Sequence, residues 1–324
     1  MIDVVAERSA LGGLERWLRD PTVTEIMVNG GHDIWVERHG SLQHVGHMRP
    51  TTVLAAIEHM LAPVGRRLDR SHPTVDARLP DGARLCAAIP PIAVDGPCLT
   101  IRRFPPRRLT LEAFAPEPVV ALLHELVDRR CNVVISGATS SGKTTLLDAM
   151  AHGVPPHERL VTLEDVAELR LAHPHVVRLE TREATPDGVG EVTLAHLLRA
   201  ALRMRPDRLL VGEVRGAEAM QLLQALNTGH DGSLCTVHAN SAVDALDRLA
   251  ALVLQAGEGW PLAAVHRLVV RAVDVVVHVE RQSEGRRAVT EVVEVLPTLR
   301  RTAPAVRALV VDGRVDDVLT RCRR

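Results

Sequence analysis

The sequence is poor in aromatic residues: they make up 2% of its 324 residues, and Tyr is absent. Proteins that hold single-stranded nucleic acid stack its bases on aromatic side chains, and few such platforms are available here. The net charge is -1 at pH 7, so no overall positive field attracts phosphate backbones or anionic lipid. Composition therefore disfavours nucleic acid as a partner.

The cysteines form no recognisable pattern. Cys86, Cys98, Cys131, Cys235 and Cys322 are scattered, without a Cys-x-x-Cys pair. This spacing disfavours a disulfide framework and a structural zinc site, so we expect buried thiols and no zinc. The sequence has neither a secretion signal nor an apolar run long enough to span a bilayer. We expect a cytoplasmic protein that reaches the membrane only through partners.

A proline pair separates two parts of different pattern. Residues 1–104 predict a small α+β domain, and Phe104-Pro105-Pro106 cannot continue a helix or an inner strand. We therefore place a linker at 105–112 and a second domain at 113–324. Within the first part the pattern predicts helices at 11–18 and from Thr51 or Thr52 to about 61, a hairpin turn at 29–31, a strand entering a turn at 75–82, and strands at 24–28, 34–37, 85–89 and 99–103.

After the linker, apolar strands alternate with helices, which predicts an α/β domain with a parallel sheet. The expected strands are 132–136, 160–163, 176–179, 209–211 and 233–237, and the expected helices are 117–127, 143–150, 192–204, 217–226 and 243–254. From residue 273 onward we expect two or three further strands.

The clearest motif spans residues 137–144, which match G-x-x-x-x-G-K-[ST] at every fixed position, between an apolar strand and an apolar-faced helix. Lys143 is expected to reach the β- and γ-phosphates, and the Thr144 hydroxyl to ligate Mg²⁺. The motif predicts that the chain binds ATP with Mg²⁺. The predicted nucleotide-binding residues of this segment are Gly137, Ala138, Thr139, Ser140, Ser141, Gly142, Lys143, Thr144 and Thr145.

Two acids at strand ends are candidates for the chemistry. Glu213 follows the strand at 209–211 and could orient or deprotonate the attacking water. Many phosphate-loop enzymes carry a metal-binding Asp one position earlier, but Gly212 stands there, so another acid must help to hold the metal. Glu164 ends another strand, which gives a predicted metal set of Thr144, Glu164 and Glu213. The alternatives are a surface acid for Glu213 and an exposed loop acid for Glu164.

A histidine completes the predicted catalytic set of Glu213, Lys143, Glu164 and His238. His238 follows a strand on the side of the sheet where nucleotides bind. It could donate a hydrogen bond to the γ-phosphate and respond to its loss. The alternative is a histidine that serves packing alone.

Arginine stabilises the charge that develops on a transferring phosphoryl group. Candidates are Arg84, Arg102 and Arg103 in the first domain, and Arg199, Arg203 and Arg215 in the second. Each of them could equally be a solvated surface charge.

Six segments together resemble the ATPases of type II and type IV secretion systems: 23–30, 77–84, 99–104, 162–169, 203–216 and 229–240. With the phosphate loop, the resemblance covers nearly the whole chain. It points to the branch that drives Tad (Flp-type) pili, known as CpaF or TadA, in a short form similar to actinobacterial ones. The lack of a cysteine-rich zinc insert argues against the type II secretion and type IV pilus assembly branches.

The resemblance implies a PAS-like first domain and a RecA-like motor domain. It further implies a hexameric ring, with ATP between the two domains and first-domain arginines closing over it. Glu213 would be the catalytic glutamate, and Gly212 is normal for this family. The implied partners are inner-membrane platform proteins, which would place the chain peripherally at the inner face of the cell membrane.

The favoured hypothesis is an ATP-hydrolysing motor that powers Tad-type pilus assembly or type II/IV secretion. The alternative is a nucleic-acid motor, either a conjugative DNA-transfer ATPase or a helicase-like enzyme. A third hypothesis is a nucleotide-gated regulator without productive turnover.

Overall fold

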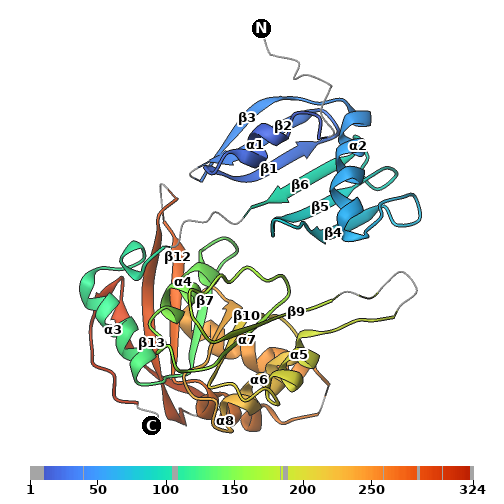
Figure 1. The fold of residues 1–324 in the computed structure, drawn as a ribbon. Helices are drawn as coiled ribbons and strands as arrows, with labels where there is room; N and C mark the ends of the chain where they lie inside the picture. Colours follow the sequence, from blue (N-terminus) through green and yellow to red (C-terminus); the bar gives the residue numbers. More distant parts are fainter. Residues whose placement is uncertain are drawn as a thin grey trace. The chain divides into compact units, whose positions relative to one another are not determined.

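The structure is a computed structural model, and it describes residues 11–38, 40–103, 109–182, 184, 189–257, 259–282, 285–300 and 302–321. The chain divides into two compact units, 1–107 and 108–324 (Figure 1). This division falls within the predicted linker at 105–112, of which 105–108 lie outside the described residues, as does Phe104. Leu111 already packs into the core of the second unit.

The first unit is built on a six-stranded antiparallel sheet in the order β3-β2-β1-β6-β5-β4. One face of the sheet packs on the helices around a core that includes Ile26, Ile34 and Val53, while alternate strand residues face solvent. The elements are α1 (Glu15–Arg19), β1 (Val23–Asn29), β2 (Asp33–Arg38), β3 (Ser41–His47), α2 (Pro50–Leu61), η1 (Ala62–Val64), β4 (Thr74–Arg78), β5 (Arg84–Ala88) and β6 (Cys98–Arg102).

The predicted elements of this unit are present, with three differences. α1 begins at Glu15 rather than at residue 11. α2 begins at Pro50 with Arg49 as its N-terminal cap, so the prediction of Thr51 or Thr52 was wrong; proline favours the first helical position because its missing N–H has no helical partner there. β3 was not predicted. The hairpin turn is confirmed, with φ of 59° at Gly30 and 68° at Gly31.

The second unit contains a nine-stranded sheet in the order β15-β14-β13-β12-β7-β11-β10-β8-β9. The strands from β12 to β9 are parallel, while β13, β14 and β15 are antiparallel additions. Its elements are η2 (Leu111–Ala113), α3 (Glu117–Asp128), β7 (Val133–Gly137), α4 (Lys143–Ala151), β8 (Leu160–Glu164), β9 (Val176–Glu180), α5 (Leu194–Ala201), β10 (Arg208–Val214), α6 (Glu218–Leu226), β11 (Leu234–His238), α7 (Ala242–Gln255), α8 (Leu262–Ala272), β12 (Val275–Arg281), β13 (Arg287–Arg300), β14 (Ala303–Val311) and β15 (Arg314–Val315).

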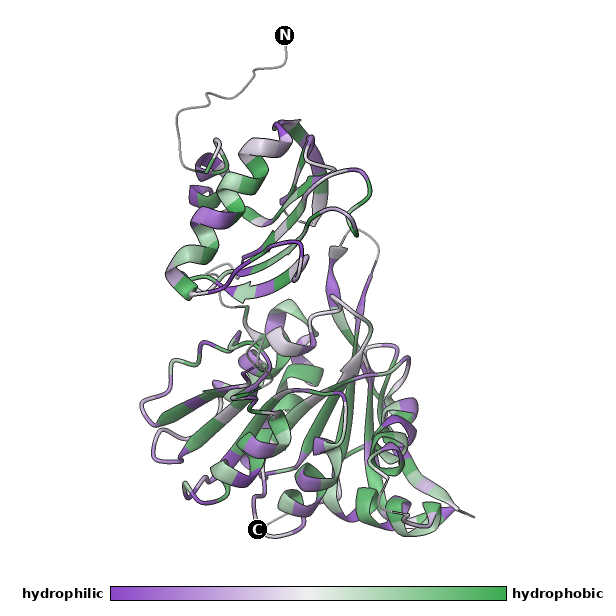
Figure 2. Cartoon of the chain, turned by 90° about the vertical axis from the view of Figure 1, so that its right-hand side faces the viewer, coloured by the Kyte–Doolittle hydropathy of each residue, from purple (hydrophilic) through white to green (hydrophobic). Residues whose placement is uncertain are grey.

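Two cores sandwich this sheet, as the predicted α/β architecture requires. One core joins it to α3 and α4, and the other joins it to α5, α6, α7 and α8. Figure 2 shows the strands of this sheet as largely hydrophobic, because parallel strands are buried on both faces. Among the described residues, no helix is both long and apolar enough to cross a membrane.

Three details of the second unit differ from expectation. α5 is shorter than the predicted 192–204 at both ends, and at its start a capping box of Thr193 and His196 begins the helix at Leu194. α8 was not predicted, and it begins directly after Pro261. The described part of the tail from residue 273 to 321 forms four strands instead of two or three.

Candidate functional site

The phosphate loop joins β7 to α4, as predicted. Ser140 and Gly142 adopt left-handed backbone conformations, with φ of 60° and 102°, and Gly142 is the N-terminal cap of α4. A helix N-terminus carries free N–H groups and the positive end of the helix dipole. This turn is therefore suited to bind phosphate.

Two glycines of the loop have no room for a side chain. A Cβ atom at Gly137 would collide with the backbone oxygen of Val279 and the hydroxyl of Ser141. A Cβ atom at Gly142 would lie 2.6 Å from the side chain of Arg287. Packing as well as backbone conformation therefore requires glycine at both positions.

The ammonium group of Lys143 is enclosed by its own loop. The residue is 6% exposed, and Nζ donates hydrogen bonds to the backbone oxygens of Gly137 at 3.1 Å and Ala138 at 2.9 Å. Nζ also lies 3.4 Å from both ring nitrogens of His238. Lys143 thus connects the phosphate loop to the end of β11.

His238 and Glu213 meet across neighbouring strands. His238 pairs in register with Gly137 of β7, and its Nε2 lies 2.8 Å from Oε1 of Glu213. The other carboxylate oxygen of Glu213 accepts a hydrogen bond from Arg215 at 2.7 Å. Burial and the neighbouring Lys143 lower the pKa of His238. The predicted lysine, histidine and glutamate therefore form one continuous chain of contacts.

A β-bulge in β10 directs the glutamate into this chain. Gly212 and Glu213 together stand opposite the single residue Thr236 of β11, and the Thr236 hydroxyl donates to the Gly212 carbonyl at 2.5 Å. In a regular strand, side chains three positions apart point to opposite faces of the sheet. Val211 and Val214 nevertheless pack into the same core. The extra residue turns Glu213 away from that core.

Glu164 lies against Gly212 on the adjacent strand β8. It is 2% exposed, and a Cβ atom at position 212 would lie 3.0 Å from its Cγ atom. An aspartate at 212 would compete with Glu164 for this space. Glycine at 212 thus lets Glu164 approach β10 closely, while the role of Glu164 in place of the missing aspartate stays a prediction.

The two carboxylate oxygens of Glu164 have different surroundings. Oε1 accepts hydrogen bonds from the backbone N–H groups of Glu168 and Leu169, both at 2.9 Å. Oε2 is buried and has no hydrogen-bond partner. Burial raises the pKa of Glu164 to about 7 in spite of the two N–H donors. A buried oxygen without a partner fits a cation or its water shell, and the oxygens of Thr144 and Glu213 add the donor type that Mg²⁺ prefers.

The chain matches a known family along most of its length. The sequence pattern of the family described as type II/IV secretion system protein matches residues 7–305. The chain belongs to this family. The predicted family is thereby confirmed, while the assignment to the Tad branch stays a prediction.

Members of the family and a solved structure resemble the chain over most of its length. A Mycobacterium tuberculosis (strain H37Rv) protein, provisionally named a conjugal transfer protein, is 39% identical over 318 residues, covering 94% of this chain and 89% of that protein. The type IV secretion system protein VirB11 of Brucella suis is 33% identical over 300 residues, covering 82% and 83%. The crystal structure of the Legionella pneumophila ATPase DotB is 20% identical with a TM-score of 0.64, covering 89% and 82%. This likeness confirms the predicted fold class.

The predicted arginines of the second unit differ in whether they lie near the predicted catalytic glutamate. Arg215 is 59% exposed, and besides Glu213 it lies 3.7 Å from Asp165. Arg199 lies in the last turn of α5, and Arg203 is exposed just beyond it. The structure thus brings Arg215, rather than these two, to the predicted catalytic glutamate.

The predicted arginines of the first unit are occupied within that unit. Nη1 of Arg103 donates to three backbone oxygens, including that of Asp20 at 2.5 Å. Arg84 lies 3.4 Å from Asp76 and pairs in register with Arg102 on β6. Arg103 therefore ties a loop to the sheet, whereas Arg84 and Arg102 lie side by side. Their binding to nucleotide stays a prediction.

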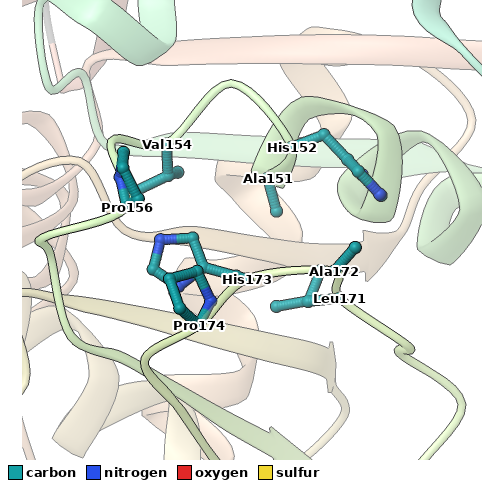
Figure 3. A pocket seen from close by; sticks show the side chains of 8 residues that line it. All are labelled: Ala151, His152, Val154, Pro156, Leu171, Ala172, His173 and Pro174. Atoms are coloured by element: carbon teal, nitrogen blue, oxygen red, sulfur yellow. The ribbon is translucent and has the colours of Figure 1, made fainter.

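A cavity of about 470 Å³ adjoins the phosphate loop, and its lining includes Ala138 and His238. A smaller pocket of about 180 Å³ lies between the end of α4 and residues 171–174 (Figure 3). His152 and His173 line this smaller pocket, but none of the predicted catalytic residues does. We therefore place the functional site at the larger cavity.

Sequence reasoning missed two cationic residues near the loop. Arg248 of α7 lines the larger cavity and contributes to the lowered pKa of His238. Arg287, at the start of β13, lies against Gly142. Both lie outside the recognised motifs, so no sequence pattern indicated them.

Proposed function

We propose that the chain is an ATP-hydrolysing motor of a type IV secretion or conjugal transfer system. The observation that carries this proposal is the contact chain from Lys143 through His238 to Glu213, which joins the phosphate loop to the acid at the end of β10. The names of the related proteins, which refer to conjugal transfer and type IV secretion, support the biological setting.

In the proposed reaction, Lys143 binds the β- and γ-phosphates, and Glu213 orients the attacking water and accepts its proton. The water oxygen bonds to the γ-phosphorus as the bond to the bridging oxygen breaks, which releases ADP and phosphate. Thr144 and Glu164 would hold Mg²⁺, which neutralises charge on the phosphate oxygens. His238, whose pKa is lowered by burial, would donate a hydrogen bond to the γ-phosphate.

Replacing the phosphate-binding lysine tests the enzymatic part of the proposal. Lys143→Ala should abolish phosphate release from Mg-ATP and weaken ATP binding. Arg199→Ala, on α5, is the control and should retain both. A Lys143→Ala variant that turns over ATP at the wild-type rate would refute the proposed site.

We further propose a six-subunit ring that binds an inner-membrane platform, with Arg84 and Arg102 contributing to nucleotide binding. Family membership supports the ring, and the register that sets the two arginines side by side supports their shared role. Mass photometry with saturating Mg-ATP should detect six chains, and Arg84→Ala and Arg102→Ala should each raise the KM for ATP. A chain that stays monomeric with Mg-ATP would contradict the ring. An unchanged KM for ATP would exclude a role of these two arginines in nucleotide binding.

Within such a system we propose that the motor moves protein components and does not itself track along DNA, because the neutral charge and scarce aromatic residues do not suit a strand-tracking channel. Tad-type pilus assembly is one such output. Phosphate release should therefore be insensitive to single-stranded DNA at low salt. A large stimulation that disappears at high salt would instead identify a DNA-transfer motor. In the host, the Lys143→Ala allele should abolish surface pili if the output is Tad assembly.

A further inference from the structure

Two histidines and a carboxylate, none of which belongs to the proposed ATPase site, converge on the β2–β3 hairpin of the first unit. Nε2 of His44 lies 3.3 Å, and Nδ1 of His47 lies 2.9 Å, from Oδ1 of Asp33. All three ligand atoms lie within 4.8 Å of one another. Around a tetrahedral ion with bonds of about 2.0–2.2 Å, neighbouring ligand atoms stand about 3.3–3.6 Å apart. Small side-chain rotations therefore bring all three atoms onto one ion.

A β-bulge creates this cluster. Asp33 pairs with His47 and Trp35 pairs with His44, which leaves Val45 as an extra residue in β3. Without this extra residue, His44 and His47, which are three positions apart, would face opposite sides of the strand. Val45 packs instead against the core, and both histidines stay on the outer face with Asp33. A bulge re-aims side chains in this way, often next to functional sites.

The outer face of the hairpin leaves the three ligands accessible. On the opposite face of β2, Ile34 is 2% exposed, whereas the side chains of Asp33, His44 and His47 are 48%, 34% and 52% exposed. β3 is an edge strand of its sheet (Figure 1). The ring of Trp35 packs edge-on against His44 at a centroid distance of 5.2 Å, which restricts the rotation of that imidazole.

The donor set indicates the class of ion. Two imidazole nitrogens and one carboxylate suit Zn²⁺ and its transition-metal neighbours, whereas Mg²⁺ and Ca²⁺ require oxygen ligands. We propose that Asp33, His44 and His47 bind one transition-metal dication of the zinc class, with water in the remaining position. The expectation of no zinc rested on cysteine spacing alone, and this site needs no cysteine.

The test is a ZnCl₂ titration of the metal-stripped full-length chain against a chromophoric chelator. We expect one tight zinc ion per chain, and binding weakened on the order of tenfold or more by His44→Ala or His47→Ala. Because an ion that binds only the folded state stabilises it, zinc should also raise the Tm of the wild type and not that of the double variant. MgCl₂ at the same concentration should not compete.

A matched control lies on the same unit. His72 is 3.7 Å from Asp69, and both are exposed, so this histidine–aspartate pair has a similar composition without the third ligand. His72→Ala should bind zinc as the wild type does. The proposal is overturned if the His44 and His47 double variant retains wild-type affinity, or if His72→Ala loses as much. An unchanged Tm without metal would show that the double variant is folded.

Discussion

A Cβ atom placed on Gly212 would lie 3.0 Å from the Cγ atom of Glu164. Glycine at the end of β10 therefore lets the acid of β8 approach the strand closely. Glu213 follows directly in the bulge of β10. Both acids therefore lie at the same edge of the sheet: Glu164 because it approaches β10 closely, and Glu213 because the bulge adds an extra residue.

Restoring an aspartate at position 212 should damage the site rather than improve it. Gly212→Asp adds a side chain and a second negative charge beside the buried Glu164, and we expect a loss of about 1–3 kcal/mol from overpacking alone. Urea unfolding measures this loss. Gly153→Ala is the control, because a Cβ atom there makes ordinary contacts of 3.4 Å or more. Equal stability of the two variants would contradict the close approach.

The stability of the metal-free, nucleotide-free protein should depend on pH through Glu164. Burial raises the folded pKa of Glu164 from its ordinary value of 4.5 to about 7. Its contribution to the free energy of unfolding is therefore fully present below pH 4.5 and is lost as pH rises through 7. The shift corresponds to about 3 kcal/mol at most. Glu164→Gln should therefore gain stability relative to the wild type between pH 5 and pH 8. Chemical denaturation of both proteins at pH 5 and pH 8 measures this gain. A difference in unfolding free energy that is the same at both pH values would contradict the raised pKa of Glu164.

A buried ion pair supports β10 at its other end. Arg208 is 1% exposed and binds Glu158 through Nε at 2.6 Å and Nη2 at 3.0 Å, while Nη1 donates to the backbone oxygen of Val127 at 2.9 Å. Arg208→Met should destabilise the fold by about 3–5 kcal/mol, because it leaves a buried carboxylate without its main partner.

The control for this ion pair is the more exposed arginine that shares the same carboxylate. Arg130 lies 2.9 Å from Glu158, and its side chain is 28% exposed. Arg130→Met should cost less than Arg208→Met in guanidinium unfolding. An equal cost would show that burial does not decide the strength of these interactions.

Lys143 is the sole lysine of the sequence, which makes it a specific spectroscopic probe. A sample labelled with ¹³C at lysine Cε should give one side-chain signal. Because phosphate oxygens would replace the loop carbonyls as partners of Nζ, Mg-ATP should shift this signal. Glu213→Gln should retain the shift, whereas an unshifted signal at saturating ATP would exclude Lys143 as a phosphate ligand.

The sequence was sufficient to predict the phosphate loop because the motif and its flanking strand and helix are local features. It also placed Glu213 and His238 at one edge, since parallel strands align their carboxyl ends. It did not predict the bulges opposite Thr236 and at Val45, because a bulge depends on pairing with a distant strand. The sequence also did not predict the role of Arg103. This residue binds backbone carbonyls about eighty positions away in the chain, so its role again depends on distant contacts.

The most direct test of the account is single-turnover phosphate release by the Glu213→Gln variant, measured beside ATP binding. Glu213 contacts His238, which in turn contacts Lys143, so its carboxylate is placed to act on water at the γ-phosphate. We predict that Glu213→Gln slows phosphate release by about 100-fold or more while ATP affinity stays at the wild-type level. Phosphate release at the wild-type rate would contradict the central claim.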